Sequence, residues 1–169
     1  MHWNNRRGFS LVELAVVLTI SGLILAIGTP GLIRYLNSAR VRDSARTLAE
    51  EMRLARQKAV TNGTRNYVYT QYGTNQNQYW TGVMTQQTNG VWPSSPVWRG
   101  PIDLPEKTKQ IGSNFSGYVY FYYDPSGRPR QPLIGSNPPY SSGSVKVVST
   151  VPGITDTTTV SLDLSGSVW

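Results

Sequence analysis

The stretch Arg6-Arg7-Gly8-Phe9-Ser10-Leu11-Val12-Glu13-Leu14 opens an apolar run that continues to Ile33. From Leu14 to Ile33 there are twenty consecutive residues without a charge. At a rise of about 1.5 Å per residue, a helix of this length spans the roughly 30 Å hydrocarbon core of a bilayer. The run is therefore predicted to cross a membrane.

Two features separate this run from an ordinary secretory leader. Residues 1–8, MHWNNRRG, are basic and lack the apolar stretch of roughly 7–15 residues that a signal peptide carries before its cleavage site. Glu13 lies inside the apolar segment, where burying an unpaired carboxylate costs several kcal/mol. This glutamate therefore requires a cationic partner.

The stretch 7–14 resembles the processing motif of type IV pilins and pseudopilins. The resemblance implies that a prepilin peptidase cuts after Gly8 and that the new N-terminal residue, Phe9, is N-methylated. It further implies a glutamate at the fifth mature position, here Glu13, and a helix-bending proline, here Pro30. All four residues fall at the spacing of the family.

The same resemblance assigns Glu13 a partner. In assembly, the carboxylate of an incoming subunit meets the amine of Phe9 on its neighbour, and each neutralises a charge that the other could not bury alone. A single-span anchor with a tolerated glutamate is the alternative. The implied partners are other pilin or pseudopilin subunits through the N-terminal helix, prepilin peptidase, the inner-membrane assembly platform and, before assembly, the membrane.

The 169 residues allow one membrane helix and one small domain. We expect a leader at 1–8, a transmembrane and filament-core helix at 9–33, an amphipathic helix half at 34–63 and a β-rich head at 64–169. The fold class is α+β, the type IV pilin fold, with the long N-terminal helix packed on an antiparallel sheet. The expected location is the bacterial inner membrane with a periplasmic head, and then a pilus or pseudopilus.

Composition argues against an enzyme. The chain has no cysteine, and its single histidine, His2, lies in the leader. The mature chain therefore lacks Ser-His-Asp and Cys-His nucleophiles and the usual zinc ligands, so neither a metal nor a cofactor is expected. The acids beyond the helix are scattered, and we interpret them as turn residues rather than calcium ligands: Asp103, Glu106, Asp124, Asp156 and Asp163. The missing disulfide also favours a minor pilin or pseudopilin over a disulfide-bearing major subunit.

The helix is predicted to cover residues 10–61 and to end at Gly63, since glycine adopts the left-handed conformation of a helix C-terminus at little cost. Pro30 and the two glycines flanking it mark a point where the helix could bend or unwind. Beyond Pro30, apolar residues recur at helical spacing. The sheet is expected to pack on the small residues of this face, which are Ala45, Ala49, Ala55 and Ala59.

Beyond Gly63 the apolar pattern has a period of two and is interrupted by turn residues, which predicts an antiparallel sheet. The predicted strands are 66–72, 79–85, 118–124, 144–150 and 157–164. Residues 86–101 and 131–143 are rich in Gly, Pro, Ser and Asn and are expected to form long surface loops.

The formal net charge is +7, and residues 34–58 carry seven basic side chains against three acidic ones. We expect these arginines either to hold anionic lipid headgroups just outside the membrane or to pair with acids on neighbouring subunits. A solvated helix face is the simpler alternative.

The head resembles the GspH/FimT group of minor pilins in residues 49–60 and 121–127 and in Ser165-Gly166. Within it, Gly127-Arg128-Pro129-Arg130 resembles the Gly-Arg-x-Arg motif of FimT-type pilins, which bind DNA in natural transformation. Arg128 and Arg130 are candidate phosphate contacts, and nearby aromatic residues offer stacking surfaces: Trp92, Trp98, Tyr118, Tyr120 and Tyr122. In the FimT type the motif lies in the C-terminal tail, whereas the tail here contains no arginine.

The sequence thus favours a minor type IV pilin that is processed by prepilin peptidase and enters, or initiates, a pilus fibre. A GspH-like pseudopilin of a type II secretion system is the first alternative. A FimT-like DNA-binding pilin is the second.

Overall fold

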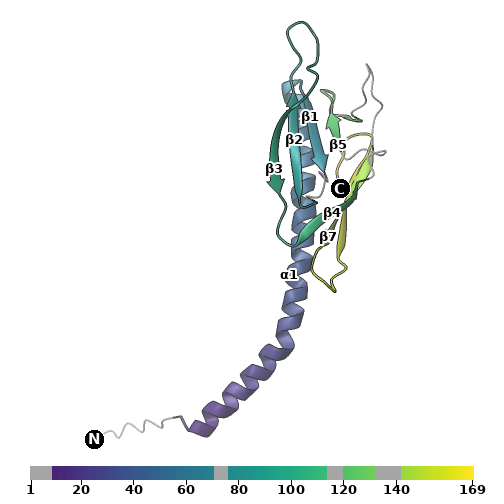
Figure 1. Ribbon diagram of the computed structural model, residues 1–169. Coiled ribbons are helices and arrows are strands. Elements are labelled where there is room, and N and C mark those ends of the chain that lie inside the picture. The colour runs from purple at the N-terminus through teal and green to yellow at the C-terminus, as the bar shows by residue number, and fades with distance from the viewer. Residues whose placement is uncertain (1–8, 71–75, 114–119, 132–141) are drawn as a thin grey trace, which may run out of the picture. The chain divides into compact units, whose positions relative to one another are not determined.

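The computed structural model describes residues 9–70, 76–113, 120–131 and 142–169 (Figure 1). The chain divides into two compact units, residues 1–36 and residues 37–169, and each is described by itself. The first unit contains the beginning of helix α1 (Leu11–Asn62). The second contains the rest of that helix and all the strands.

Helix α1 has a recognisable cap at each end. The Ser10 hydroxyl accepts a backbone N–H two residues further on at 3.3 Å, and Glu13 accepts the Ser10 N–H at 2.9 Å, which together form a capping box. Gly63 follows the helix with φ +63°, and the Thr64 N–H donates to the Ala59 carbonyl at 3.2 Å, as in a Schellman motif. The predicted helix is confirmed to within one residue at each end.

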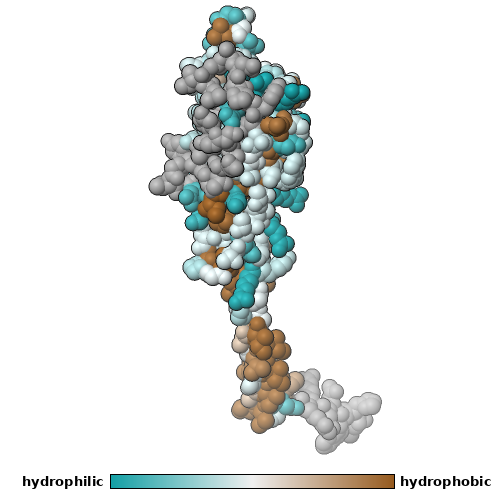
Figure 2. Space-filling model, turned by 90° about the vertical axis from the view of Figure 1, so that its right-hand side faces the viewer, coloured by the Kyte–Doolittle hydropathy of each residue, from teal (hydrophilic) through white to brown (hydrophobic). Residues whose placement is uncertain are grey.

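The first unit presents apolar side chains on all sides. Every residue from Phe9 to Leu36 is exposed, and the apolar helix forms a hydrophobic band in Figure 2. Pro30 lies inside the helix, which continues without a break, so local unwinding does not occur. In the part of the chain that the structure describes, the length and composition of α1 would allow it to cross a membrane. A surface of this kind is expected to be covered by lipid or by other protein molecules.

The second unit contains two antiparallel sheets (Figure 1). The first sheet has the order β3 (Val97–Asp103), β2 (Gln78–Met84), β1 (Arg65–Thr70), β5 (Tyr120–Tyr123) and β6 (Pro129–Arg130). The second has the order β4 (Thr108–Ser113), β7 (Gly143–Ser149) and β8 (Thr157–Leu162). Gln110 of β4 connects them, because its side-chain amide donates to the carbonyl of Gln78 in β2 at 3.2 Å.

The core of the second unit lies between α1 and both sheets. Its helix side consists of the small residues Ala45, Ala49, Ala55 and Ala59, each at most 7% exposed, together with Leu48 and Met52. The sheets contribute Val68, Phe121, Tyr123, Val145, Val147 and Val160 to the same cluster. This arrangement confirms the prediction that the sheet packs on the small-residue face of the helix. Short side chains there let the strands approach the helix closely.

The predicted strands are all present, with boundaries shifted by one or two residues where the structure describes them. The predicted antiparallel pairing is confirmed, and the strands form two sheets rather than one. Strands β3, β4 and β6 were not predicted, and the expected loop 86–101 is wrong from Val97 onward. Most of the expected loop 131–143 lies outside the described residues, as do positions 71–72 and 118–119.

The missed strands lack an alternating apolar pattern for a physical reason. In β4 the inward positions are polar: Thr108 and Gln110 are 2% and 0% exposed. The Thr108 hydroxyl is paired with the Ser44 hydroxyl at 2.8 Å, and the Gln110 amide donates to the Gln78 carbonyl. Strand β3 is an edge strand that is exposed along nearly all its length, so it buries no apolar face.

Candidate assembly site

Glu13 lies in the first turn of α1, and its carboxylate is bound to its own helix start. Its Oε2 accepts the Ser10 N–H at 2.9 Å. The unpaired N–H groups and the dipole of a helix N-terminus favour a negative charge at this position. In the described part of the chain, no cation lies within ion-pair distance of Glu13. The cap therefore satisfies one oxygen but leaves the charge without a counter-ion.

The other predicted processing residues lie beside this cap. Phe9 directly precedes it and is 84% exposed. Gly8 lies outside the described residues, and so does the rest of the leader. Cleavage after Gly8, methylation of Phe9 and the charge pair with Glu13 therefore stay predictions. Pro30 lies on the same helix, in its exposed apolar part.

The exposed apolar side chains of this helix define what it can do. Leu11 is 84% exposed and Ile27 is 75% exposed, and the residues between them are exposed as well. Each large aliphatic side chain left in water forgoes about 1.5–3 kcal/mol of burial free energy. A helix of this kind is stable in a bilayer or in a bundle of similar helices.

Two turns of the head share one sequence pattern and one set of hydrogen bonds. Residues 124–128 read Asp-Pro-Ser-Gly-Arg, and residues 163–167 read Asp-Leu-Ser-Gly-Ser. In each turn the aspartate Oδ1 accepts the serine N–H, the serine hydroxyl and the N–H of the fifth residue. The glycines have positive φ, 77° at Gly127 and 83° at Gly166. Both aspartates are turn residues as predicted, although Asp124 is buried rather than solvated.

Arg56 of helix α1 ties these two turns together. Its Nε donates to the Gly127 carbonyl at 3.1 Å, and one of its terminal nitrogens donates to the Ser165 carbonyl at 3.0 Å. One helical turn earlier, Arg53 donates to the Val168 carbonyl at 2.7 Å. These two arginines bind the backbone of their own head. The expected contacts of the helix arginines with lipid or neighbouring subunits stay a prediction.

Arg130, one of the two candidate DNA contacts, forms an ion pair within the head. Its Nε lies 2.7 Å from Asp124 Oδ2, and the two side chains are only 19% and 11% exposed. Burial raises the pKa of Asp124, but hydrogen bonds from Ser126, Arg130 and Arg128 outweigh burial and hold this pKa below its usual value. Arg128 is exposed, and its N–H completes the Asp124 turn. The ion pair gives Arg130 a structural role.

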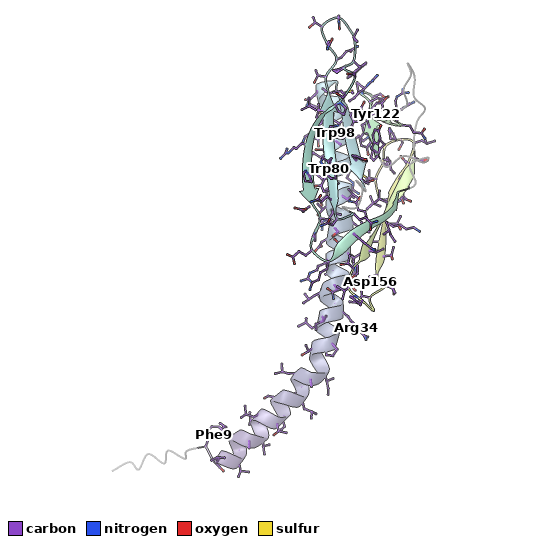
Figure 3. All side chains as sticks on the ribbon, viewed as in Figure 1. Phe9, Arg34, Trp80, Trp98, Tyr122 and Asp156 are labelled. Atoms are coloured by element: carbon purple, nitrogen blue, oxygen red, sulfur yellow. The ribbon has the colours of Figure 1, made fainter. Side chains whose placement is uncertain are left out.

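The candidate stacking residues pack largely on other side chains of the head. Tyr67 stacks on Tyr122 with ring centroids 4.8 Å apart, and the Arg65 guanidinium lies 4.1 Å from the Trp92 ring centroid. Burial raises the pKa of Tyr67 to about 12. Tyr120 belongs to this cluster, and Figure 3 shows Trp98 on the same part of the head. Tyr118 lies outside the described residues. The aromatic face thus forms a second small core.

Sequence reasoning missed Ser10 and Arg56. The signal for Ser10 was the Ser-x-x-Glu spacing of a capping box. For Arg56, the repeated Asp-x-Ser-Gly pattern predicts two similar turns, but no local sequence pattern indicates that one arginine binds both. In the described ranges, no group of three or more His, Cys, Asp or Glu side chains is placed to hold a metal ion.

A long helix with an exposed apolar first part, which packs its small-residue face against antiparallel strands, is the architecture of a type IV pilin. The family description "Prokaryotic N-terminal methylation motif" matches residues 3–29. The crystal structure of the type IV minor pilin FimU from Pseudomonas aeruginosa has a similar fold, with a TM-score of 0.51 and 10% sequence identity. The similarity covers 76% of this chain and 86% of FimU. No curated protein matches the sequence.

Residues 3–29 thus carry the N-terminal methylation motif, and the fold is similar to that of a type IV minor pilin. Type IV pilins are structural subunits and not enzymes, and they associate with other pilin subunits. The exposed apolar helix is consistent with membrane anchoring.

Proposed function

We propose that the chain is a minor pilin that enters a pilus fibre or initiates its assembly. In this proposal prepilin peptidase removes residues 1–8, and Phe9 becomes the methylated N-terminus. The subunit then waits in the inner membrane, with residues 9–33 in the bilayer and the head in the periplasm. The assembly platform moves it from there into the fibre.

The observation that carries the proposal is the placement of Glu13. It lies at the fifth position after the proposed cleavage site, on a helix whose apolar residues are exposed throughout. Its second carboxylate oxygen has no protein donor among the described residues. An incoming Phe9 amine would meet that oxygen and supply the counter-ion that the chain itself lacks.

The assignment as a minor subunit has separate support. The similar fold of FimU belongs to a protein described as a minor pilin. The chain also has no cysteine, so it lacks the disulfide loop expected of many major subunits. In this chain, Arg53 and Arg56 of the helix instead hold the C-terminal residues of the head through hydrogen bonds to backbone carbonyls.

The processing step is tested by replacing Gly8 with valine in the native host. The variant should retain the leader, and mass spectrometry of the membrane fraction should show a chain that still contains residues 1–8. A normal mature mass would refute the assigned cleavage site.

The assembly step is tested with two substitutions of Glu13. Glutamine also serves at the third position of a capping box, so Glu13→Gln keeps the cap and removes the charge, whereas Glu13→Ala removes both. Removing one partner of a buried ion pair typically costs about 3–5 kcal/mol, so both variants should insert into the membrane but be depleted from sheared fibres. Normal recovery of Glu13→Gln in fibres would show that the charge is not needed.

A GspH-like pseudopilin would use the same processing and the same charge pair. The two functions differ in what fails when the gene is deleted. A minor pilin is required for surface fibres, whereas a pseudopilin is required for export of folded proteins. If deletion of the gene leaves surface fibres intact but abolishes export of folded proteins, the chain is a pseudopilin and not a minor pilin.

The FimT-like DNA-binding function is less favoured because Arg130 is paired with Asp124 and the aromatic residues pack on each other. Titration of the detergent-solubilised full chain with labelled DNA at several salt concentrations tests it. Arg128→Ala is the informative variant, since it leaves the ion pair in place. Salt-sensitive binding that Arg128→Ala weakens would restore this function.

A further inference from the structure

The turn between β7 and β8 is apolar. Residues 151–154 read Val-Pro-Gly-Ile, and the Ile154 N–H closes the turn by donating to the Val151 carbonyl at 3.2 Å. Pro152 and Gly153 are exposed, while Val151 and Ile154 are half-buried. Turns commonly carry Asn, Asp or Ser alongside Gly and Pro. This turn instead presents hydrocarbon at one end of the head.

The turn is fixed to the helix at a known place. Asp156 accepts a hydrogen bond from the Ser38 hydroxyl of α1, and Figure 3 marks Asp156 at the lower end of the head. On the other side, the Thr150 N–H donates to the Lys107 carbonyl at 2.8 Å. These bonds hold the apolar turn beside residue 38 of the helix, with the exposed Lys107 next to it.

The sequence places the membrane boundary just before residue 38. The apolar run ends at Ile33 and is followed by Arg34 and the 67% exposed Tyr35. An arginine and a tyrosine at this position are typical of the membrane interface, where long cations snorkel and aromatic rings form a belt. Ser38 follows Arg34 by four residues. That separation is about 6 Å along a helix and at most about 14 Å in a fully extended chain.

Polar headgroups add roughly 5–7 Å to each side of the hydrocarbon core, so the turn and the headgroup layer lie within reach of each other. We propose that residues 151–154 rest on the phospholipid headgroups of the membrane that α1 spans before assembly, with the Lys107 ammonium group on a lipid phosphate. The inference rests on the proposed membrane-anchored pilin. Glu106 beside Lys107 offsets its charge, so the apolar turn provides the main contact.

The absence of cysteine makes a direct test available. The full chain is reconstituted in vesicles of phosphatidylethanolamine and phosphatidylglycerol, with one spin-labelled cysteine at a time. Pro152→Cys and Thr155→Cys probe the turn. Thr88→Cys probes another exposed position, in the loop at the opposite end of the head (Figure 1), and Leu23→Cys probes the apolar helix.

Both turn labels should be severalfold less accessible to a water-soluble nickel chelate, and more accessible to oxygen, than the Thr88 label. Turn labels as water-accessible as the Thr88 label, with the Leu23 label shielded, would overturn the headgroup contact and leave the anchored pilin intact. A water-accessible Leu23 label would overturn the membrane anchor, and the headgroup contact with it. Circular dichroism of each labelled variant verifies that the head is folded.

Discussion

Replacing Gly166 with alanine should destabilise the head through two additive effects. At φ +83° a residue with a Cβ costs about 1–2 kcal/mol more than glycine. The added Cβ would also lie well inside 3.0 Å of the Gly127 carbonyl oxygen and 3.3 Å from the Tyr123 ring, and such overpacking costs about 1–3 kcal/mol. The free energy of unfolding should therefore fall by about 2–5 kcal/mol in total.

Gly153→Ala is the matched control for the backbone effect alone. Gly153 has φ +78°, but a Cβ there would have no neighbour within 4 Å, so only about 1–2 kcal/mol should be lost. Urea unfolding of the detergent-solubilised full chain, followed by tryptophan fluorescence, gives both values. Equal losses of unfolding free energy in the two variants would refute the close contact between the turns 124–128 and 163–167.

Three further substitutions, at Arg56, Leu48 and Asp124, and one control, at Arg46, test the interactions that stabilise the head. Arg56→Gln should lower the free energy of unfolding by about 1–3 kcal/mol in the same assay, because two charge-assisted hydrogen bonds to carbonyls are lost. As a control, Arg46→Gln breaks an exposed ion pair with Glu50 and should lower it by less than about 1 kcal/mol. Leu48→Ala should cost about 2–5 kcal/mol, since Leu48 is 0% exposed. The pKa of Asp124 is lowered in the folded state, so its ionised form stabilises the head above the ordinary carboxyl pKa of 3.8. This contribution should be lost as the pH falls through the folded-state pKa. The difference in unfolding free energy between the parent chain and Asp124→Asn should therefore shrink in acid.

The parts of the fold that were predictable carry their signal in consecutive residues. The helix was found to within a residue because Gly63 and the apolar and small-residue face each act through local spacing. The strands found from sequence bury alternating apolar residues, as β7 does with Val145 and Val147.

The parts that were missed depend on long-range pairing. Strand β4 buries Thr108 and Gln110 because Ser44 and Gln78 provide hydrogen-bond partners. No pattern in the neighbouring sequence predicts those partners. The role of Arg130 also depends on the fold. As part of a Gly-Arg-x-Arg sequence it suggests a phosphate contact, whereas the hairpin of β5 and β6 turns it back onto Asp124.

The contact between Arg56 and Ser165 also constrains the order in which the head is completed. These residues are 109 positions apart in the sequence. In the proposed topology the head crosses the membrane after the helix, so Ser165 and Val168 arrive long after Arg53 and Arg56. Until they do, Arg53 and Arg56 have no tail carbonyls to bind. The head therefore makes these bonds only after Ser165 and Val168 have crossed the membrane, and a variant truncated before Ser165 would lack the hydrogen bonds between Arg53, Arg56 and the tail.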